Sequence, residues 1–188
     1  TGLKALDERL QGLVAGDNVV WRVDEVEEYR PYVDAMAEAG IEAEAEVIYF
    51  RFADHEPLLP GKAGVSWVEL KPEEGFEAFI TEIHDRIRNA RPGDVYIFDC
   101  LSGLTATRYS DRMIGNFFRL TCPYLREKGA LAYFGLYRHL HSHHAVVPVE
   151  ETTQILIDSY TVSENRYLQI YKIERHGAIR FSSQVYRE

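Results

Sequence analysis

The stretch DVYIFDCL, residues 94–101, decides the fold of this chain. Apart from its two aspartates it is an apolar run, which predicts a strand buried on both faces in the middle of a parallel sheet. Pro92-Gly93 breaks the chain just before it. A second apolar run, ALAYFGLY at residues 130–137, follows a long helix that we expect over residues 110–128. Strand, helix and strand in this order predict a parallel β-α-β unit.

The sequence on both sides extends this alternation. Leucines at spacings of three and four in residues 3–13 predict a short helix closed by Gly16. Further strands are expected at residues 18–23, 45–52 and 65–70, further helices at 27–39 and 76–90, and three final strands at 154–162, 166–174 and 178–186. Ser163-Glu164-Asn165 and His176-Gly177 separate the final strands and resemble hairpin turns. The sequence therefore predicts a three-layer α/β fold, with a mostly parallel central sheet flanked by helices and antiparallel C-terminal hairpin strands.

Composition limits the domain count and the class of partner. The 188 residues have enough apolar content for one core, so we expect a single domain over residues 1–188. The chain begins at Thr1 rather than Met, and we expect it to be a fragment of a longer chain. A net charge of -9 disfavours nucleic acid and anionic lipid as partners. Two cysteines and no apolar run long enough to span a bilayer predict a cytoplasmic protein without membrane contact.

Three local patterns, in order along the chain, resemble the RecA/KaiC branch of P-loop ATPases. The opening Thr1-Gly2-Leu3, continued to Gly16-Asp17, is similar to the T-G-L, L-D and G-G-L pattern at the start of that family. Val95 to Leu104 resembles its Walker B strand and the turn after it, and Lys172 to Gly177 resembles its K-x-R-G-S hairpin. The resemblance covers nearly the whole chain and implies a RecA/KaiC-like fold that assembles as a homo-oligomer.

Four more specific strings narrow this resemblance. They are residues 16–21 (GDNVVW), 115–118 (GNFF), 121–124 (TCPY), and His141-Ser142 with His144-Ala145. Together they resemble the KaiC-like N-terminal domain of some bacterial pyruvate phosphate dikinase or phosphoenolpyruvate-synthase-like proteins. This resemblance implies an accessory domain joined to a C-terminal phosphotransfer enzyme domain, and it brings none of that enzyme's catalytic residues into this chain.

The chain departs from the family where a phosphate-binding loop belongs. A Walker A loop, G-x-x-x-x-G-K-[ST], uses glycines and a lysine to hold phosphates, but residues 23–31 read VDEVEEYRP and contain neither. The segment instead carries four carboxylates, Asp24, Glu25, Glu27 and Glu28. Like charges about 4 Å apart repel by about 4 kcal/mol near a protein surface, so these carboxylates disfavour the binding of a polyphosphate. Their simplest interpretation is the acidic start of a helix. The acidic pair expected after the second strand is also missing, because residues 52–55 read FADH. We therefore predict a non-catalytic regulatory, assembly or docking domain without ATPase activity of its own.

The alternative hypothesis is a nucleotide or small anion bound by non-Walker contacts at the carboxyl ends of the strands, where open α/β sheets bind ligands. Asp99 would then hold Mg²⁺, and Arg30, Arg108 and Arg138 would supply positive charge. The competing and favoured interpretation of Asp99 is an inherited residue that caps the next turn. We expect no cofactor under the first hypothesis, and a nucleotide with Mg²⁺ under the alternative.

Ser102 and the histidines of residues 138–144 (RHLHSHH) complete the candidate ligand-binding residues. Ser102 with a nearby histidine suggests a hydrolase pair, but Leu101-Ser102-Gly103 lacks the G-x-S-x-G elbow. The segment holds four of the seven histidines, and on a strand His139, His141 and His143 would share one face. A metal site, a polar-ligand or subunit contact, and a plain loop all remain open. His141 and His144 are favoured as contacts because they belong to the resemblance.

Overall fold

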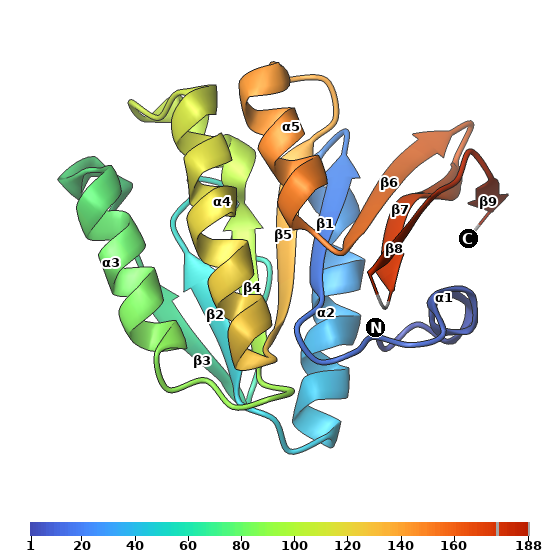
Figure 1. Ribbon diagram of the computed structural model, residues 1–188, viewed down its shortest axis with the longest axis horizontal. Coiled ribbons are helices and arrows are strands. Elements are labelled where there is room, and N and C mark those ends of the chain that lie inside the picture. Colours follow the sequence, from blue (N-terminus) through green and yellow to red (C-terminus); the bar gives the residue numbers. More distant parts are fainter. Residues whose placement is uncertain (176, 188) are drawn as a thin grey trace.

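The computed structural model describes residues 1–175 and 177–187, which fold around one central sheet (Figure 1). Its strands lie in the order β3-β2-β4-β5-β1-β6-β7-β8, and β9 pairs with β7. The strands are β1 Asn18–Val23, β2 Val47–Arg51, β3 Val65–Glu69, β4 Val95–Cys100, β5 Leu131–Tyr137, β6 Ile155–Val162, β7 Asn165–Arg175, β8 Ala178–Phe181 and β9 Val185–Arg187. The helices are α1 Lys4–Leu10, α2 Val26–Glu42, α3 Phe76–Ile87, α4 Asp111–Lys128 and α5 His143–Thr152, with short 3-10 turns η1 Pro72–Glu74 and η2 Leu101–Ala106.

The first six strands of the sheet, from β3 to β6, are parallel, and the C-terminal strands are antiparallel. β4 lies between β2 and β5, and β1 lies between β5 and β6. β7 runs antiparallel to β6, and both β8 and β9 run antiparallel to β7. The predicted three-layer α/β fold, with its mostly parallel sheet and antiparallel C-terminal strands, is confirmed.

Helices cover both faces of the sheet, as Figure 1 shows. α3, α4 and α5 pack on one face, and α1 and α2 pack on the other. β4 alternates between the two cores, since Tyr96 and Phe98 join the first core and Val95 and Ile97 join the second. All six residues of β4 are buried. The apolar run at residues 94–101 therefore forms a strand buried on both faces in the middle of the sheet, as predicted.

Close packing of aromatic rings fixes β4 and β5 between these layers. The rings of Phe98 and Phe134 stack with their centroids 4.5 Å apart. On the opposite face Tyr29 of α2 lies against Gly135, where an added Cβ would come within 2.8 Å of the tyrosine ring. Gly135 therefore lets α2 approach β5, which no larger residue would allow without a shift.

Several predicted boundaries are wrong. The first helix ends at Leu10, not at Gly16, because Gln11 adopts the left-handed conformation there. α2 continues through Gly40 to Glu42, because a glycine at this position clears Val47 of β2, which an added Cβ would approach to 2.8 Å. The last predicted strand is split into β8 and β9. His176, which belongs to the turn predicted before this strand, lies outside the described residues.

Helix α5 is the one described helix without a sequence prediction. β5 ends at Tyr137 and α5 begins at His143, so His139, His141 and His143 do not share the face of a strand. Ala145 and Val149 of α5 are buried against the core that α4 also lines. Among the described residues, no helix combines the length and the apolar character that crossing a bilayer requires.

Candidate functional site

The carboxyl ends of the parallel strands carry most of the candidate residues. Asp24 follows β1, Asp99 lies at the end of β4, and Arg138 follows β5. Because these strands are neighbours and parallel, their carboxyl ends meet at one edge of the sheet. This is the edge where α/β sheets bind ligands, and it is where the structure has to provide any anion or metal site that the sequence suggested.

Asp99 is fully buried, and protein donors occupy both of its carboxylate oxygens. Arg51 Nη1 lies 2.6 Å from Oδ2, which also accepts hydrogen bonds from the backbone N–H groups of Phe52 at 2.8 Å and Ala53 at 3.0 Å. The hydroxyl of Tyr49 donates to Oδ1. His55 Nε2 lies 3.7 Å from the same oxygen. The carboxylate is thus held by a cation, a hydroxyl and two amides.

Tyr49 links Asp99 to the loop after β2. Its hydroxyl accepts a hydrogen bond from the backbone N–H of Leu58 at 3.1 Å and donates to Asp99. Burial raises the pKa of Tyr49, and the nearby Asp99 carboxylate raises it further. The phenol therefore remains a donor across the physiological range, which keeps the carboxylate occupied.

The acidic segment after β1 forms the first turn of a helix, as predicted. α2 begins at Val26, only three positions after β1 ends, and carries Glu27 and Glu28 in its first turn. Glu28 Oε2 accepts a hydrogen bond from the backbone N–H of Asp24 at 2.8 Å. These carboxylates bring negative charge to the N-terminus of α2, where the helix dipole favours it.

The three candidate arginines are engaged at different places. Nε and Nη2 of Arg138 each donate to Asp24 at 2.8 Å, and its guanidinium lies over the ring of Tyr160. Arg30 donates to the backbone carbonyl of Pro57 at 2.8 Å. Arg108 makes no hydrogen bond or ion pair within the described part of the chain and lines a pocket of about 730 Å³ beside α3. The structure therefore does not gather them around one anion.

Ser102, His141 and Asp111 form a hydrogen-bonded chain. Ser102 Oγ lies 2.6 Å from His141 Nε2, and His141 Nδ1 lies 2.8 Å from Asp111 Oδ1. Asp111 Oδ2 also accepts from the backbone N–H of Ser142 at 2.6 Å. Burial raises the pKa of Asp111, but the hydrogen bonds from Ser142 and His141 outweigh it and lower the pKa to about 2. The order of groups is that of a serine-hydrolase triad.

The surroundings of Ser102 oppose a nucleophilic role. Its side chain is 2% exposed, and its Oγ accepts a hydrogen bond from the backbone N–H of Tyr137 at 2.8 Å. A serine nucleophile has to reach an incoming carbonyl carbon, which a buried hydroxyl cannot do. The chain of hydrogen bonds instead fastens η2 and the end of β5 to the start of α4. Sequence reasoning considered Ser102 beside an unspecified nearby histidine and named His141 as a candidate contact. It missed Asp111, whose only sequence signal is its place after the helix-capping Ser110.

The histidine segment is divided between two environments. His141 is held in the chain to Ser102, whereas His143 and His144 start α5 with ring centroids 3.9 Å apart. Both line a hollow of about 370 Å³ with Arg112 and Arg119 of α4, a lining rich in positive charge. Within residues 1–175 and 177–187, no cluster of three or more histidine, cysteine or carboxylate side chains has a metal-binding arrangement.

Comparison with known proteins adds no assignment to this geometry. The chain matches no protein-family model, and it matches no curated protein.

Proposed function

We propose that this chain is a RecA/KaiC-like domain without nucleotide chemistry of its own, which serves in regulation, assembly or docking beside a pyruvate phosphate dikinase-like enzyme domain. The observation that carries the proposal is the saturation of Asp99. A Mg²⁺ ion needs free carboxylate oxygens in near-octahedral geometry, and both oxygens of Asp99 already face protein donors. A metal would therefore have to displace Tyr49 from Oδ1, or Arg51 and two backbone N–H groups from Oδ2.

The segment after β1 supports the same proposal. Asp24 holds Arg138 through two hydrogen bonds, so the arginine nearest the end of β1 and β5 is already neutralised. Glu27 and Glu28 add two more carboxylates to the same turn. A polyphosphate placed here would meet this negative charge with no lysine to offset it. We further propose a cytoplasmic location, since Cys100 and Cys122 are buried free thiols, and self-association through the edges of the domain.

A second candidate function, anion or nucleotide binding by non-Walker contacts, is favoured by Arg108 alone. This arginine has no partner within the described residues, and the pocket of about 730 Å³ beside it is also lined by Phe76, Tyr109 and one carboxylate, Glu73. A cation beside two aromatic rings is a suitable lining for a planar anionic ligand. The site lies beside α3 and is independent of Asp99.

A thermal-shift titration separates the two functions, because a ligand that binds the native state raises its melting temperature. The ligands are ATP, ADP, AMP and pyrophosphate at millimolar concentration, each with and without Mg²⁺. Our proposal predicts no shift, whereas a ligand at about 100 times its Kd would add about 2.7 kcal/mol. A Mg²⁺-dependent shift that Asp99→Asn removes would overturn the proposal.

Two matched arginine variants identify the second function. Arg108→Gln removes the unpaired cation, and Arg112→Gln removes the same charge from α4. A nucleotide shift that disappears in Arg108→Gln and persists in Arg112→Gln would establish binding beside α3. Equal shifts in both variants would exclude it.

A further inference from the structure

The outer edge of β3 is open. Within the described residues β3 pairs only with β2, in a regular parallel register from Val47–Val65 to Arg51–Glu69. The N–H of Leu70 donates to the carbonyl of Arg51 at 2.8 Å, which continues this ladder. Because alternate residues of a strand turn their N–H and C=O to opposite sides, Val65, Trp67 and Glu69 present theirs away from β2.

Within β3 itself, no lysine, proline or bulge protects this edge against pairing. Edge strands are commonly blunted by lysine, proline or a bulge, and β3 reads VSWVE with no break in its register. Trp67 is 42% exposed, an unusual position for a large aromatic side chain. The edge is therefore a template on which another extended backbone can add a strand.

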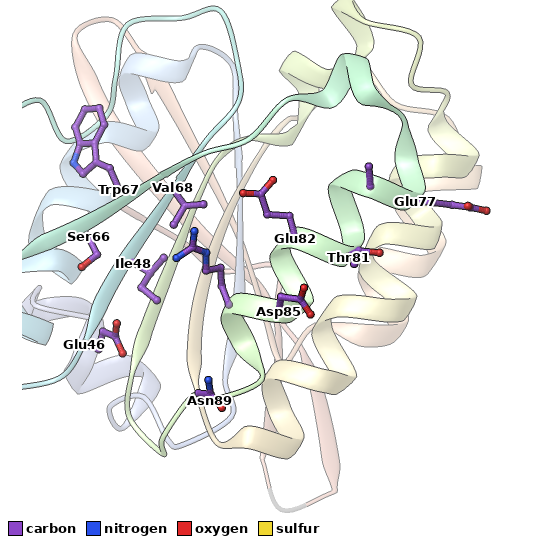
Figure 2. A pocket seen from close by; sticks show the side chains of 12 residues that line it. Glu46, Ile48, Ser66, Trp67, Val68, Glu77, Thr81, Glu82, Asp85 and Asn89 are labelled. Atoms are coloured by element: carbon purple, nitrogen blue, oxygen red, sulfur yellow. The ribbon is translucent and has the colours of Figure 1, made fainter.

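A groove of about 1060 Å³ lies beside this edge, between β3 and α3 (Figure 2). Ile48 and Val68, both nearly buried, form its apolar part on the strand side. Helix α3 forms the other wall, from which Glu82 extends toward Val68, while Glu46 lies on the strand side. The groove thus combines an open backbone edge with a shallow apolar floor and acidic walls.

The charge of the groove is unbalanced. Glu46, Glu77 and Glu82 are among the lining residues, and their side chains make no hydrogen bond or ion pair within the described part of the chain. The side chain of Glu77 points away from the strands (Figure 2), so Glu46 and Glu82 supply the unpaired carboxylates of the groove. Asp85 also lines the groove but is paired with Arg88. Arg86 is the one cation among the lining residues. Two unpaired carboxylates, Glu46 and Glu82, against one guanidinium favour a positively charged occupant.

We propose that this groove binds an extended segment of a partner protein that carries lysine or arginine at alternate positions and adds as a strand beside β3. Its backbone bonds to the outward N–H and C=O groups of Val65, Trp67 and Glu69. Since side chains of a strand alternate between faces, one set of basic side chains lays its aliphatic stems over Val68 and brings its charges to Glu82. The proposal deepens the docking role and rests on it.

Fluorescence anisotropy with the 188-residue chain tests the proposal. The probe is a fluorescein-labelled peptide of about nine residues, a typical strand length, with lysine and threonine alternating. Its control has glutamate in place of every lysine. We expect the lysine peptide to bind, with affinity about tenfold weaker when salt rises from about 50 mM to about 300 mM, and the glutamate peptide not to bind.

Two pairs of variants test the charges and the backbone edge separately. The double variant Glu46→Gln/Glu82→Gln should weaken binding about tenfold, while Glu8→Gln/Glu127→Gln removes the same charge from two other exposed positions and should leave binding unchanged. Glu69→Pro removes an outward N–H donor without touching the ladder to β2 and should abolish binding. Glu69→Ala loses the same carboxylate and keeps the N–H, so it should bind nearly as the parent does.

Three results would overturn the proposal. They are no binding of the lysine peptide at low salt, equal binding by the Glu46→Gln/Glu82→Gln variant, and equal binding by Glu69→Pro when its melting temperature matches that of Glu69→Ala. If sedimentation shows that the parent chain self-associates and that Glu69→Pro does not, the occupant of the β3 edge is a second copy of this chain and not a segment of a partner protein. If the lysine peptide does not bind and no nucleotide raises the melting temperature, the groove proposal is overturned and the proposed function stands. If the peptide binds and a nucleotide with Mg²⁺ raises the melting temperature, the groove proposal stands and the lack of nucleotide chemistry is overturned.

Discussion

Arg51 Nη1 lies 2.6 Å from Asp99 Oδ2, and this ion pair joins the ends of the neighbouring strands β2 and β4. The side chain of Asp99 is fully buried and that of Arg51 is 17% exposed. A pair this deeply buried differs from surface ion pairs, because removing one partner leaves an uncompensated charge in the protein interior. We therefore expect the pair to stabilise the carboxyl edge of the sheet, where β2 and β4 end.

Arg51→Ala should lower the free energy of unfolding by about 3 to 5 kcal/mol, because the Asp99 carboxylate would remain buried without its cation. Chemical denaturation monitored by circular dichroism measures this loss. Arg88→Ala is the matched control, since Arg88 also pairs with an aspartate but its side chain is 68% exposed. Its loss should stay below about 1 kcal/mol. Equal losses would show that Asp99 does not depend on Arg51.

Ser102→Ala should destabilise the chain by about 1 to 3 kcal/mol, because the backbone N–H of Tyr137 and the ring of His141 both lose a buried partner. Denaturation again measures the change, and Ser66→Ala at an exposed position should stay within about 0.5 kcal/mol. The parent chain should not turn over p-nitrophenyl acetate. Ester hydrolysis that Ser102→Ala abolishes would instead reveal a nucleophile.

Gly115→Ala should destabilise the contact between α4 and α5. In a free helix the change to alanine favours folding by about 1 kcal/mol, but here the new Cβ would lie 2.3 Å from the backbone oxygen of His144. A clash with backbone is not relieved by a rotamer change, so we expect a net loss of about 1 to 3 kcal/mol.

Hydrogen exchange of α5 and thermal unfolding check this effect. Asn116→Ala, at the next and exposed position of α4, gives the propensity effect without the clash. If Gly115→Ala proves as stable as Asn116→Ala, the two helices do not pack this closely.

His84 should make the chain less stable in mild acid. Burial lowers its pKa from 6.5, against the smaller opposing effect of Asp85. The unfolded chain therefore binds this proton at a higher pH than the native chain does, so the free energy of unfolding falls as pH drops from about 6.5 toward the folded pKa. The difference between the melting temperatures at about pH 7.5 and about pH 5.5 should be smaller in His84→Gln than in the parent chain. The same difference in both proteins would assign the acid sensitivity to other groups.

The helix that sequence reasoning missed shows where local patterns lose force. The start of α5 reads HHAVVP, which combines histidines, valines and a proline and gives little helix propensity. The helix forms because Ala145 and Val149 bury against α4, where Gly115 allows close approach. That stabilisation is tertiary, so no window of sequence around residue 145 carries it.

The site was predictable only in its parts. Asp99 follows from the apolar run before it, and its place at the carboxyl end of a buried strand was a direct prediction. Its partners Arg51 and Tyr49 come from another strand, 48 and 50 positions away, and no periodicity joins them. The same holds for Asp111 and His141, which lie 30 positions apart and meet only through the folding of α4 against the end of β5.

The sequence by itself determined the layered α/β architecture and the absence of a glycine- and lysine-containing phosphate loop after β1, because burial patterns and residue types are local properties of the chain. Only the tertiary structure decided how the carboxyl edge is used. Whether a carboxylate such as Asp99 is free for a metal or held by protein donors depends on which strands become neighbours, and in this sheet β2 brings Arg51 to β4. The open edge of β3 follows from the same strand order, which leaves that strand with one neighbour among the described residues.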